Sequence, residues 1–385
     1  MFERVIDRWH VRYAERIYLQ ALQETYHDRP KMTIRLFFSG VLSGIVLLSP
    51  VVVIGVGLGL IVINFPNIFS IIIGLILVVF GYLILPKHGR FEGEVYGREE
   101  LPALFELLDK ISAKLGTTSP DGVHMMGEFN AFIVQTRSPW RRRETWTVGI
   151  GFPLWEALTG QERVAVLAHE MAHRVNDDPQ RSGIFFSAQQ VLYNWHETFE
   201  EGASPQHIDQ DVDGLVRVFF QFAGFCVEMV YGVVSFASFL ESQRAEYRAD
   251  AYASRVCGAK AMIAGLEKLN RATLSDRAVL GLYPYKKDQN GRVFDHMAHS
   301  VANANSETVE RYNREAAEDN WRVDVSHPPT AMRIAFMSTL EDQTSDSLVV
   351  ASQQDFAAID TELRPYKDKL GKAFMQQLNE EEFNR

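Results

Sequence analysis

The sequence predicts a mainly α-helical protein with a small β-sheet, attached to an N-terminal transmembrane helical hairpin. Two long uncharged apolar runs near the N-terminus predict the hairpin, because a bilayer core needs about 20 apolar residues per helix. A His-Glu-x-x-His motif on a helix, preceded by short strand-like runs, predicts the domain that follows. The chain has 385 residues, which is enough for such a domain and a sizeable core.

The composition of the chain argues against some classes of protein. A formal net charge of −10 argues against nucleic acid as the main partner. The two cysteines, Cys226 and Cys257, favour a reducing compartment over a disulfide framework. Neither cysteine lies with a histidine in a pattern that is typical of a nucleophile.

Residues 1–35 form an amphipathic, basic N-terminal segment. Its apolar side chains fall on one helical face, with most of the charges on the other: Phe2, Val5, Ile6, Trp9, Tyr13 and Ile17. Such a helix suits a membrane surface, and it equally suits packing on the protein itself. A cleaved signal peptide is excluded because the apolar run starts too late.

We assign residues 36–86 to the transmembrane hairpin. Residues 36–63 and 68–85 carry no charge, and the short stretch 64–67 separates them. A buried hairpin of a soluble protein is the alternative. Basic residues flank both outer ends but not the turn: Lys31, Arg35, Lys87 and Arg90. The positive-inside rule therefore places both ends, and the rest of the chain, in the cytoplasm.

The domain of residues 89–340 opens with a predicted helix at 101–115, for which Gly116 is a suitable C-cap. Residues 123–134 and 145–150 are strand-like. The arginine-rich turn between them is expected to be solvated, although it could also touch lipid headgroups.

The stretch 164–175, VAVLAHEMAHRV, predicts a metal-binding helix. His169 and His173 are four residues apart and so project from one face toward a single ion. Glu170 lies beside the open coordination position, where it can take a proton from bound water. Residues 159–162 read as a capping box at the start of this helix. An ordinary amphipathic helix with two half-buried histidines is the alternative.

A catalytic zinc site needs a third protein ligand. The stretch 241–250, ESQRAEYRAD, supplies a candidate, because Glu246 and Asp250 share a helix face. Glu246 would bind the metal, and Asp250 would accept a hydrogen bond from a ligand histidine and fix its tautomer. The alternative is that both acids form surface pairs with Arg244 and Arg248. The pattern predicts one Zn²⁺ per chain.

The apolar segment 215–240 is long enough to span a membrane. The third ligand must lie on the same side as His169, and the helix predicted at 183–199 is too polar for a comfortable partner span. We favour a long helix packed in the protein or dipping into the membrane, with a second transmembrane hairpin as the alternative. The acidic stretch 200–214 before it is expected to be a loop.

The C-terminal part of the chain contains fewer sequence patterns that predict secondary structure or function. Helices are predicted at 259–269 and at 306–318, the latter within an otherwise irregular stretch, 273–324. A C-terminal extension, 341–385, carries an amphipathic helix at 354–382, which we expect to be peripheral.

HEMAH followed by EYRAD, behind an N-terminal hairpin, resembles the family of membrane zinc metallopeptidases that includes HtpX and the CAAX prenyl proteases. Three further segments match it: EFNAF at 128–132, TVGI at 147–150 and HPPTAMR at 327–333. The resemblance covers roughly residues 30–340 and implies an α+β, zincin-like metallopeptidase domain. The apolar pair between the zinc helix and Glu246 is weaker here than in HtpX.

The resemblance implies roles for matching positions. The zinc ligands would be His169, His173 and Glu246, with Glu170 as the general base and Asp250 supporting a ligand. Asn130, Ala131 and Phe132 would bind the substrate backbone by strand addition. His327 and Arg333 would act at the cleft, where a donor can stabilise an oxyanion. A structural or helix-capping histidine is the alternative for His327.

The sequence thus predicts a membrane-anchored zinc endopeptidase of the bacterial inner membrane, with its catalytic domain in the cytoplasm. Its partners would be the lipid bilayer and protein or peptide substrates, in membrane-protein quality control, and no nucleic acid. One alternative is a narrow-specificity processing protease of a single peptide or lipidated protein. The other is a non-catalytic membrane scaffold with a structural metal.

Overall fold

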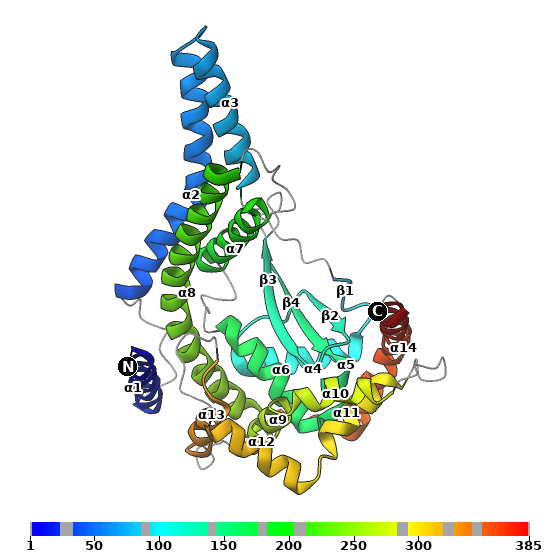
Figure 1. The fold of residues 1–385 in the computed structure, drawn as a ribbon. Coiled ribbons are helices and arrows are strands. Elements are labelled where there is room, and N and C mark those ends of the chain that lie inside the picture. Colours follow the sequence, from blue (N-terminus) through cyan, green and yellow to red (C-terminus); the bar gives the residue numbers. More distant parts are fainter. Residues whose placement is uncertain are drawn as a thin grey trace. The chain divides into compact units, whose positions relative to one another are not determined.

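The computed structural model describes residues 2–23, 34–85, 93–137, 144–175, 183–203, 213–282, 292–318, 327–340 and 349–383. It confirms a mainly helical chain with a small sheet and an N-terminal apolar hairpin (Figure 1). The chain forms two compact units. The first comprises Met1–Arg29, Arg90–Asp178 and Gln243–Arg385, and the second comprises Pro30–Gly89 and Pro179–Ser242. The domain boundaries drawn from the sequence stay predictions.

A mixed four-stranded sheet lies in the first unit. Its strands are β1 (Val95–Tyr96), β2 (Gly122–Met126), β3 (Ala131–Arg137) and β4 (Glu144–Gly151), in the order β1-β2-β4-β3. β2 runs parallel to β4, whereas β3 pairs with β4 antiparallel, with Ala131 opposite Ile150. The sequence suggested one strand over 123–134. The structure divides it, because residues 127–130 leave the ladder and return the chain as the edge strand β3.

Helices α4 (Pro102–Leu115) and α6 (Gly160–Val175) agree with the sequence prediction, whereas the short helix α5 (Phe152–Ala157) between the second predicted strand and the metal motif was not predicted. Helix α4 ends at Gly116, whose φ of 69° is in the left-handed region that favours glycine. The Glu162 carboxylate accepts a hydrogen bond from the Thr159 backbone N–H at 2.7 Å, which is one half of the predicted capping box.

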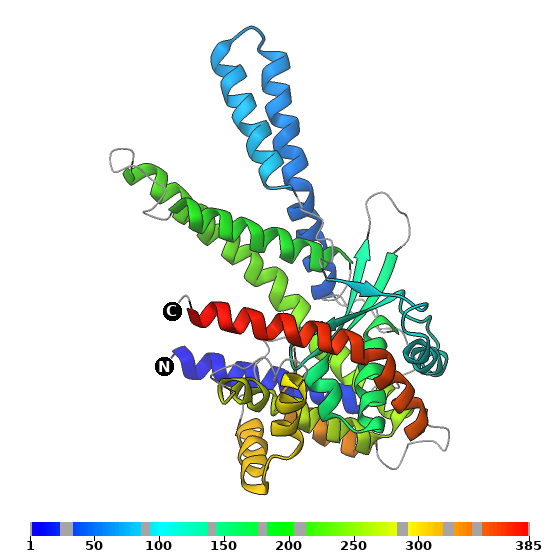
Figure 2. The same ribbon diagram turned by 90° about the vertical axis from the view of Figure 1, so that its right-hand side faces the viewer.

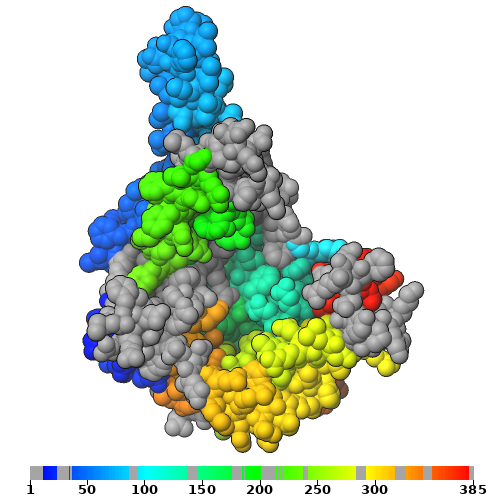
Figure 3. All heavy atoms as spheres, in the orientation of Figure 1, coloured from blue at the N-terminus to red at the C-terminus, as the bar shows by residue number. Residues whose placement is uncertain are grey.

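In the part of the chain that the structure describes, six further helices of the first unit follow the third-ligand stretch. They are α9 (Ala259–Leu269), α10 (Ala272–Leu280), α11 (Val293–Ala302), α12 (Ser306–Glu318), α13 (Thr330–Ser338) and α14 (Gln353–Phe383). The α9 and α12 predictions are confirmed, but α10 and α11 lie in the stretch predicted to be irregular. Helix α11 buries five apolar residues of its ten, among them Phe294 and Met297, whereas the apolar side chain buried in α10 is that of Val279. The atoms of α11 and α12, in yellow, lie on the face of the first unit that Figure 3 shows.

Helix α14 is an integral part of the first unit, not a peripheral one. Phe356, Ile359 and Leu363 are buried. The Glu362 carboxylate accepts hydrogen bonds from the Ala103 and Leu104 backbone N–H groups at the start of α4, at 2.7 and 3.2 Å. A helix N-terminus favours an anion, so this contact ties α14 to α4.

The N-terminal helix α1 (Phe2–Gln23) also belongs to the first unit. Ala14, Ile17 and Ala21 are 3, 3 and 5% exposed, which places one face of α1 inside the protein. Of the two interpretations of this amphipathic segment, packing on the protein itself is the one that these contacts favour.

The second unit contains the apolar hairpin of α2 (Ile34–Ile63) and α3 (Ile68–Leu83) (Figure 2). The two helices approach closely where both lack a side chain: a Cβ added to Gly57 would lie 2.6 Å from the Gly74 carbonyl oxygen. Among the described residues, one helix, Phe37–Ile63, is long and apolar enough to cross a membrane. Ile68–Leu83 and Phe220–Phe236 are shorter apolar helices.

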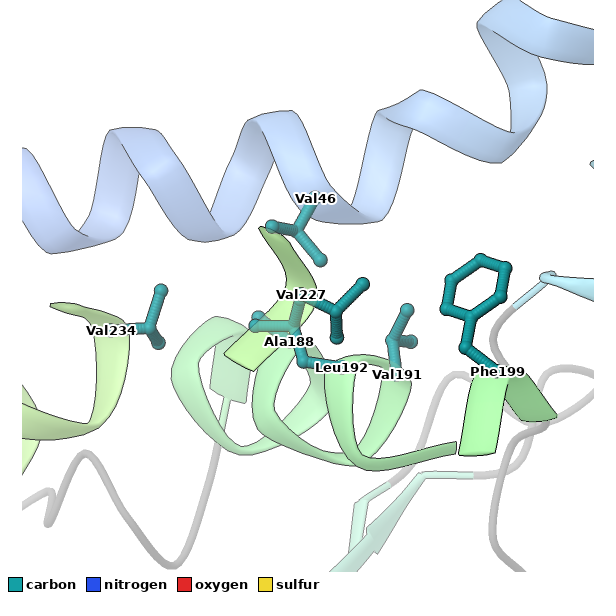
Figure 4. Close-up of a cluster of buried hydrophobic side chains, with 7 residues drawn as sticks. All are labelled: Val46, Ala188, Val191, Leu192, Phe199, Val227 and Val234. Atoms are coloured by element: carbon teal, nitrogen blue, oxygen red, sulfur yellow. The ribbon is translucent and has the colours of Figure 1, made fainter. Parts of the chain in front are cut away.

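Helix α7 (Gly183–Ala203) and the part of α8 (Asp213–Cys257) up to Ser242 pack against this hairpin within the second unit. A buried cluster joins the three helices α2, α7 and α8 (Figure 4): Val46, Ala188, Val191, Leu192, Phe199, Val227 and Val234. Residues 200–203 are helical where a loop was expected. The remaining loop residues 204–212, the predicted turn at 138–143, and Lys31, Lys87 and Arg90 lie outside the described residues.

Candidate metal centre

Helices α6 and α8 bring three potential metal ligands together. His169 and His173 come from consecutive turns of α6, and Glu246 comes from α8; their exposed fractions are 6, 1 and 1%. The two imidazole Nε2 atoms are 3.2 Å apart. Glu246 places Oε2 3.3 Å from His169 Nε2 and Oε1 3.4 Å from His173 Nε2. The two Nε2 atoms and the Glu246 carboxylate therefore face one point.

The spacing of these atoms fits a small divalent ion. Zinc binds nitrogen and oxygen ligands at about 2.0–2.1 Å in a tetrahedron, so neighbouring ligand atoms lie about 3.3–3.4 Å apart. The Nε2–Nε2 separation of 3.2 Å is close to that edge, and each imidazole Nε2 atom has one Glu246 oxygen within 3.4 Å. Two imidazoles and a carboxylate are also a donor set that suits zinc, and they leave one position for water.

Asp250, one turn after Glu246 on α8, is fully buried behind the histidines. Its Oδ1 atom lies 3.1 Å from His169 Nδ1. A carboxylate at Nδ1 holds the ring in the tautomer that directs the Nε2 lone pair toward a metal. The structure thus places Asp250 where the sequence expected a histidine support.

Arg333 of α13 binds the same Asp250 through two parallel bonds. Its Nε atom donates to Asp250 Oδ2 at 2.8 Å, and Nη2 donates to Oδ1 at 2.7 Å. The third nitrogen, Nη1, lies 3.2 Å from Glu246 Oε2. Arg333 is 6% exposed, so its planar fork is used to hold two buried carboxylates, rather than being open to a substrate.

His327 lies at the mouth of the cluster. Its Nδ1 atom is 2.9 Å from Glu246 Oε1, while 54% of the side chain is exposed. Among the two late-motif residues, His327 is therefore the one within reach of both the ligand set and solvent. Pro328 and Pro329 follow it, and α13 starts at Thr330, so the motif forms a helix entry as expected.

The pKa values reflect this packing of charge. Burial would raise the pKa of Glu246, but His327, Arg333 and His173 outweigh it and hold the pKa well below its usual range. Burial would likewise raise the pKa of Asp250, yet Arg333 lowers it. For His169, burial disfavours the charged ring, but hydrogen bonds with Asp250 and Glu246 dominate and raise the pKa to about 9.

Glu170 and the edge strand complete the surroundings. Glu170 follows His169 on α6 and is 6% exposed. Strand β3, which packs against α6, is the outer strand of the sheet in the described part of the chain. It begins at Ala131 and Phe132, and Asn130 precedes it with an exposed side chain that accepts a bond from the Ala131 N–H at 2.9 Å.

The part of the chain that holds the metal centre is similar to a known protein family. A sequence model of Peptidase family M48 matches residues 103–341, which include every residue placed at the metal centre. The chain belongs to peptidase family M48. The predicted resemblance is thereby confirmed.

Several proteins named Protease HtpX are similar to this M48 chain. The one from Vibrio parahaemolyticus serotype O3:K6 (strain RIMD 2210633) is 26% identical over 168 residues, 43% of this chain and 57% of the relative. The one from Haemophilus ducreyi (strain 35000HP / ATCC 700724) is 26% identical over 172 residues, again 43% and 57%. The alignments thus span a little over half of these relatives. No solved structure matches the chain.

The sequence did not reveal everything that surrounds the metal centre of this M48 protein. Arg333 and Asp250, which form a two-bond ion pair, are 83 positions apart in the sequence. No local spacing of residues therefore predicts this contact. The same holds for Tyr247, which is 1% exposed and contacts α1 and α13. The aromatic residue next to Glu246 was visible in the EYRAD motif, but its partners were not.

Proposed function

We propose that this chain is a membrane-anchored zinc endopeptidase. The observation that carries the proposal is the buried triad His169, His173 and Glu246, with ligand atoms within 4.8 Å of one another and Glu170 adjacent on α6. Membership of peptidase family M48 and similarity to proteins named Protease HtpX support it.

Each residue at the centre has a role in this proposal. His169, His173 and Glu246 hold the ion, and Asp250 with Arg333 keeps His169 and Glu246 oriented. A bound zinc ion would supply Lewis-acid polarisation of the substrate carbonyl and a lowered pKa for water. Glu170 takes the proton from the attacking water and passes it to the leaving amine.

Substrate would lie along the edge strand. The outer edge of β3 can extend the sheet by one strand, which fixes a peptide by backbone hydrogen bonds and leaves its side chains free to vary. Asn130, Ala131 and Phe132 stand at the end of β3 that pairs with Ile150, ten residues before Gly160 starts α6. His327, exposed beside Glu246, is placed to donate to the oxyanion that forms when the carbonyl is attacked.

The proposed setting is a bacterial inner membrane. The α2–α3 hairpin anchors the chain, and the basic residues at its outer ends, including Arg35, favour a cytoplasmic metal centre. An enzyme in this position meets membrane-associated polypeptides, so we propose membrane-protein quality control as its task. Cleavage of many unrelated unfolded membrane proteins would support that task, and cleavage of a single peptide would contradict it.

The experiment that tests the proposal compares metal content and proteolysis. Detergent-purified wild type is expected to contain one zinc per chain and to cleave casein. Glu246→Ala should lose zinc and activity together, whereas Glu170→Gln should keep zinc and lose activity, because an amide cannot accept the proton. His196→Ala is the control, since His196 pairs with Glu200 on the exposed surface of α7.

Two results would overturn the proposal. Wild-type protein without stoichiometric zinc and without proteolysis would leave the scaffold interpretation. Full proteolysis by Glu170→Gln would contradict the role of Glu170 as the general base. Loss of zinc in His196→Ala would mean that the assay reports general damage.

A further inference from the structure

The N-terminal helix α1 lies against the helices that carry the metal centre, although it is outside the region that the M48 family model matches. Its buried face includes Ala14, Ile17 and Ala21. Its opposite face is open, with Leu19 and Leu22 49 and 41% exposed. The helix therefore uses one defined face for packing.

The first contact of α1 is aromatic. The Tyr18 ring meets the Tyr247 ring edge to face, with centroids 6.0 Å apart. Tyr247 in turn meets Phe336 of α13 edge to face at 5.2 Å. Tyr247 directly follows the third ligand, Glu246, and Phe336 follows Arg333 by less than one turn. A chain of three rings thus links α1, α8 and α13.

The second contact is polar. The Arg244 Nη2 atom donates to the Gln20 Oε1 atom at 2.5 Å. Arg244 precedes Glu246 by two residues on the same turn of α8. Together, Tyr18 and Gln20 contact the residues on both sides of the third ligand.

The contacts of α1 with α8 affect the position of the Glu246 carboxylate. Arg244 and Tyr247 are three residues apart and share one helix face, whereas Glu246 and Asp250 share another. Contacts on the first face fix the rotation of α8 about its axis, and that rotation sets where the Glu246 carboxylate lies. A metal site needs its ligands within about 0.5 Å of the productive position.

We propose that α1 is an intramolecular clasp that positions Glu246 for metal binding and Arg333 for its contacts with Glu246 and Asp250, with Tyr18 and Gln20 as its positioning residues. The proposal rests on the proposed metal-dependent function. It assigns the segment before the membrane hairpin to the metal centre rather than to the membrane surface. The clasp contributes no ligand; it acts through the orientation of α8 and α13.

The test measures zinc affinity by chelator competition on the full-length protein in detergent. Tyr18→Ala combined with Gln20→Leu should raise the zinc dissociation constant about threefold to tenfold, less than the 10- to 100-fold typical of a residue bonded directly to a ligand. The visible spectrum of the Co²⁺-loaded protein should shift, because it reports ligand geometry. Tyr18→Phe and Gln20→Glu keep the ring and the acceptor, so they should preserve both readouts. Leu19→Ala, on the open face, is the control.

The outcomes separate this inference from the proposed function. If wild type binds zinc and Glu246→Ala loses it, but the double variant keeps wild-type affinity and spectrum, the clasp is refuted alone. If wild type binds no zinc, the proposed function fails first. Should the double variant not fold, Gln20→Leu alone decides: a lowered melting temperature with unchanged zinc affinity would also refute the clasp.

Discussion

At the scale of single residues, the metal centre depends on a buried balance of charge. Asp250 and Glu246 are at most 1% exposed, and Arg333 is the cation that contacts both. Ions buried in this way are tolerated only when they are paired, and removal of one partner leaves an uncompensated charge. The stability of the centre and its geometry are therefore set by the same three side chains.

Arg333→Leu should be strongly destabilising for this reason. We expect the free energy of unfolding of the metal-free protein to fall by about 3–5 kcal/mol, the usual effect of breaking a buried pair. Urea denaturation in detergent measures it. Arg311→Leu is the matched control: its pair with Glu315 is 3.9 Å long and more than half exposed, so a change of about 0–1 kcal/mol is expected. Equal effects of the two variants would contradict the assignment.

The two cysteines should differ in reactivity. Burial raises the pKa of the Cys257 thiol to about 12, and its Sγ donates to the Ala253 carbonyl at 3.0 Å, whereas Cys226 is exposed. Maleimide reacts with the thiolate, so in detergent at pH 8 a membrane-permeant maleimide should label Cys226 faster than Cys257, which should react only after unfolding. The raised pKa also means that this thiol's contribution to stability is lost above about pH 9, where the unfolded chain ionises first. Mass spectrometry of labelled peptides measures the difference in labelling between Cys226 and Cys257. Comparable labelling rates of the two cysteines would refute the prediction.

At the scale of elements, local sequence predicted those helices whose ends carry chemical signals. Gly116 and the Thr159–Glu162 contact mark such ends, and both were predicted. Helices α10 and α11 have no side-chain hydrogen bond at their N-caps, and both were missed because tertiary burial of apolar side chains holds them in place. The break between β2 and β3 was missed as well, since residues 127–130 continue an alternating pattern and only the pairing with β4 separates the strands.

The metal centre was more predictable than the fold around it. Each helix carries its two residues at a spacing of four, so the His-Glu-x-x-His motif, together with the later acidic pair, indicated His169, His173, Glu246 and Asp250. Contacts with residues of other elements, such as the contact of Arg333 with Asp250, depend on how the helices pack. No pattern in the local sequence predicts them. Helix α14 is a further example. Its amphipathic pattern predicted a helix, but it did not predict that Glu362 caps α4.

The contact between α14 and α4 makes a prediction at this scale. Glu362→Ala should lower the free energy of unfolding by about 1 kcal/mol, because two backbone N–H groups at the start of α4 lose their acceptor. Thermal unfolding in detergent is the measurement. Glu380→Ala, at an exposed position of the same helix, should have no effect. A C-terminal helix that merely covers the surface would make the two variants indistinguishable.

At the scale of the whole molecule, the distribution of exposed apolar side chains bears on the membrane. In the second unit, α8 exposes a continuous helical stripe of Val218, Phe222, Phe225, Met229 and Val233, each 55–65% exposed. A cavity of about 620 Å³ lies along this helix, lined by residues that include Phe225, Glu228 and Phe236. Water is an unfavourable environment for such a stripe, whereas lipid chains are a favourable one. The polar residues of α7, among them Glu197 and Glu200, are exposed on the neighbouring helix.

This contrast predicts that α8 contacts lipid while the exposed face of α7 contacts water. Cys226 lies on the exposed side of α8, so a nitroxide attached there reports the environment without any substitution. In proteoliposomes we expect this label to collide with oxygen far more often than with a water-soluble nickel complex, as determined by EPR power saturation. A label at Glu197→Cys, in a Cys226→Ser background, should show the reverse. Equal access of nickel to both labels would place the α8 stripe in water. It would limit the membrane contact of this protein to the α2–α3 hairpin, and some other apolar surface would then have to cover the stripe.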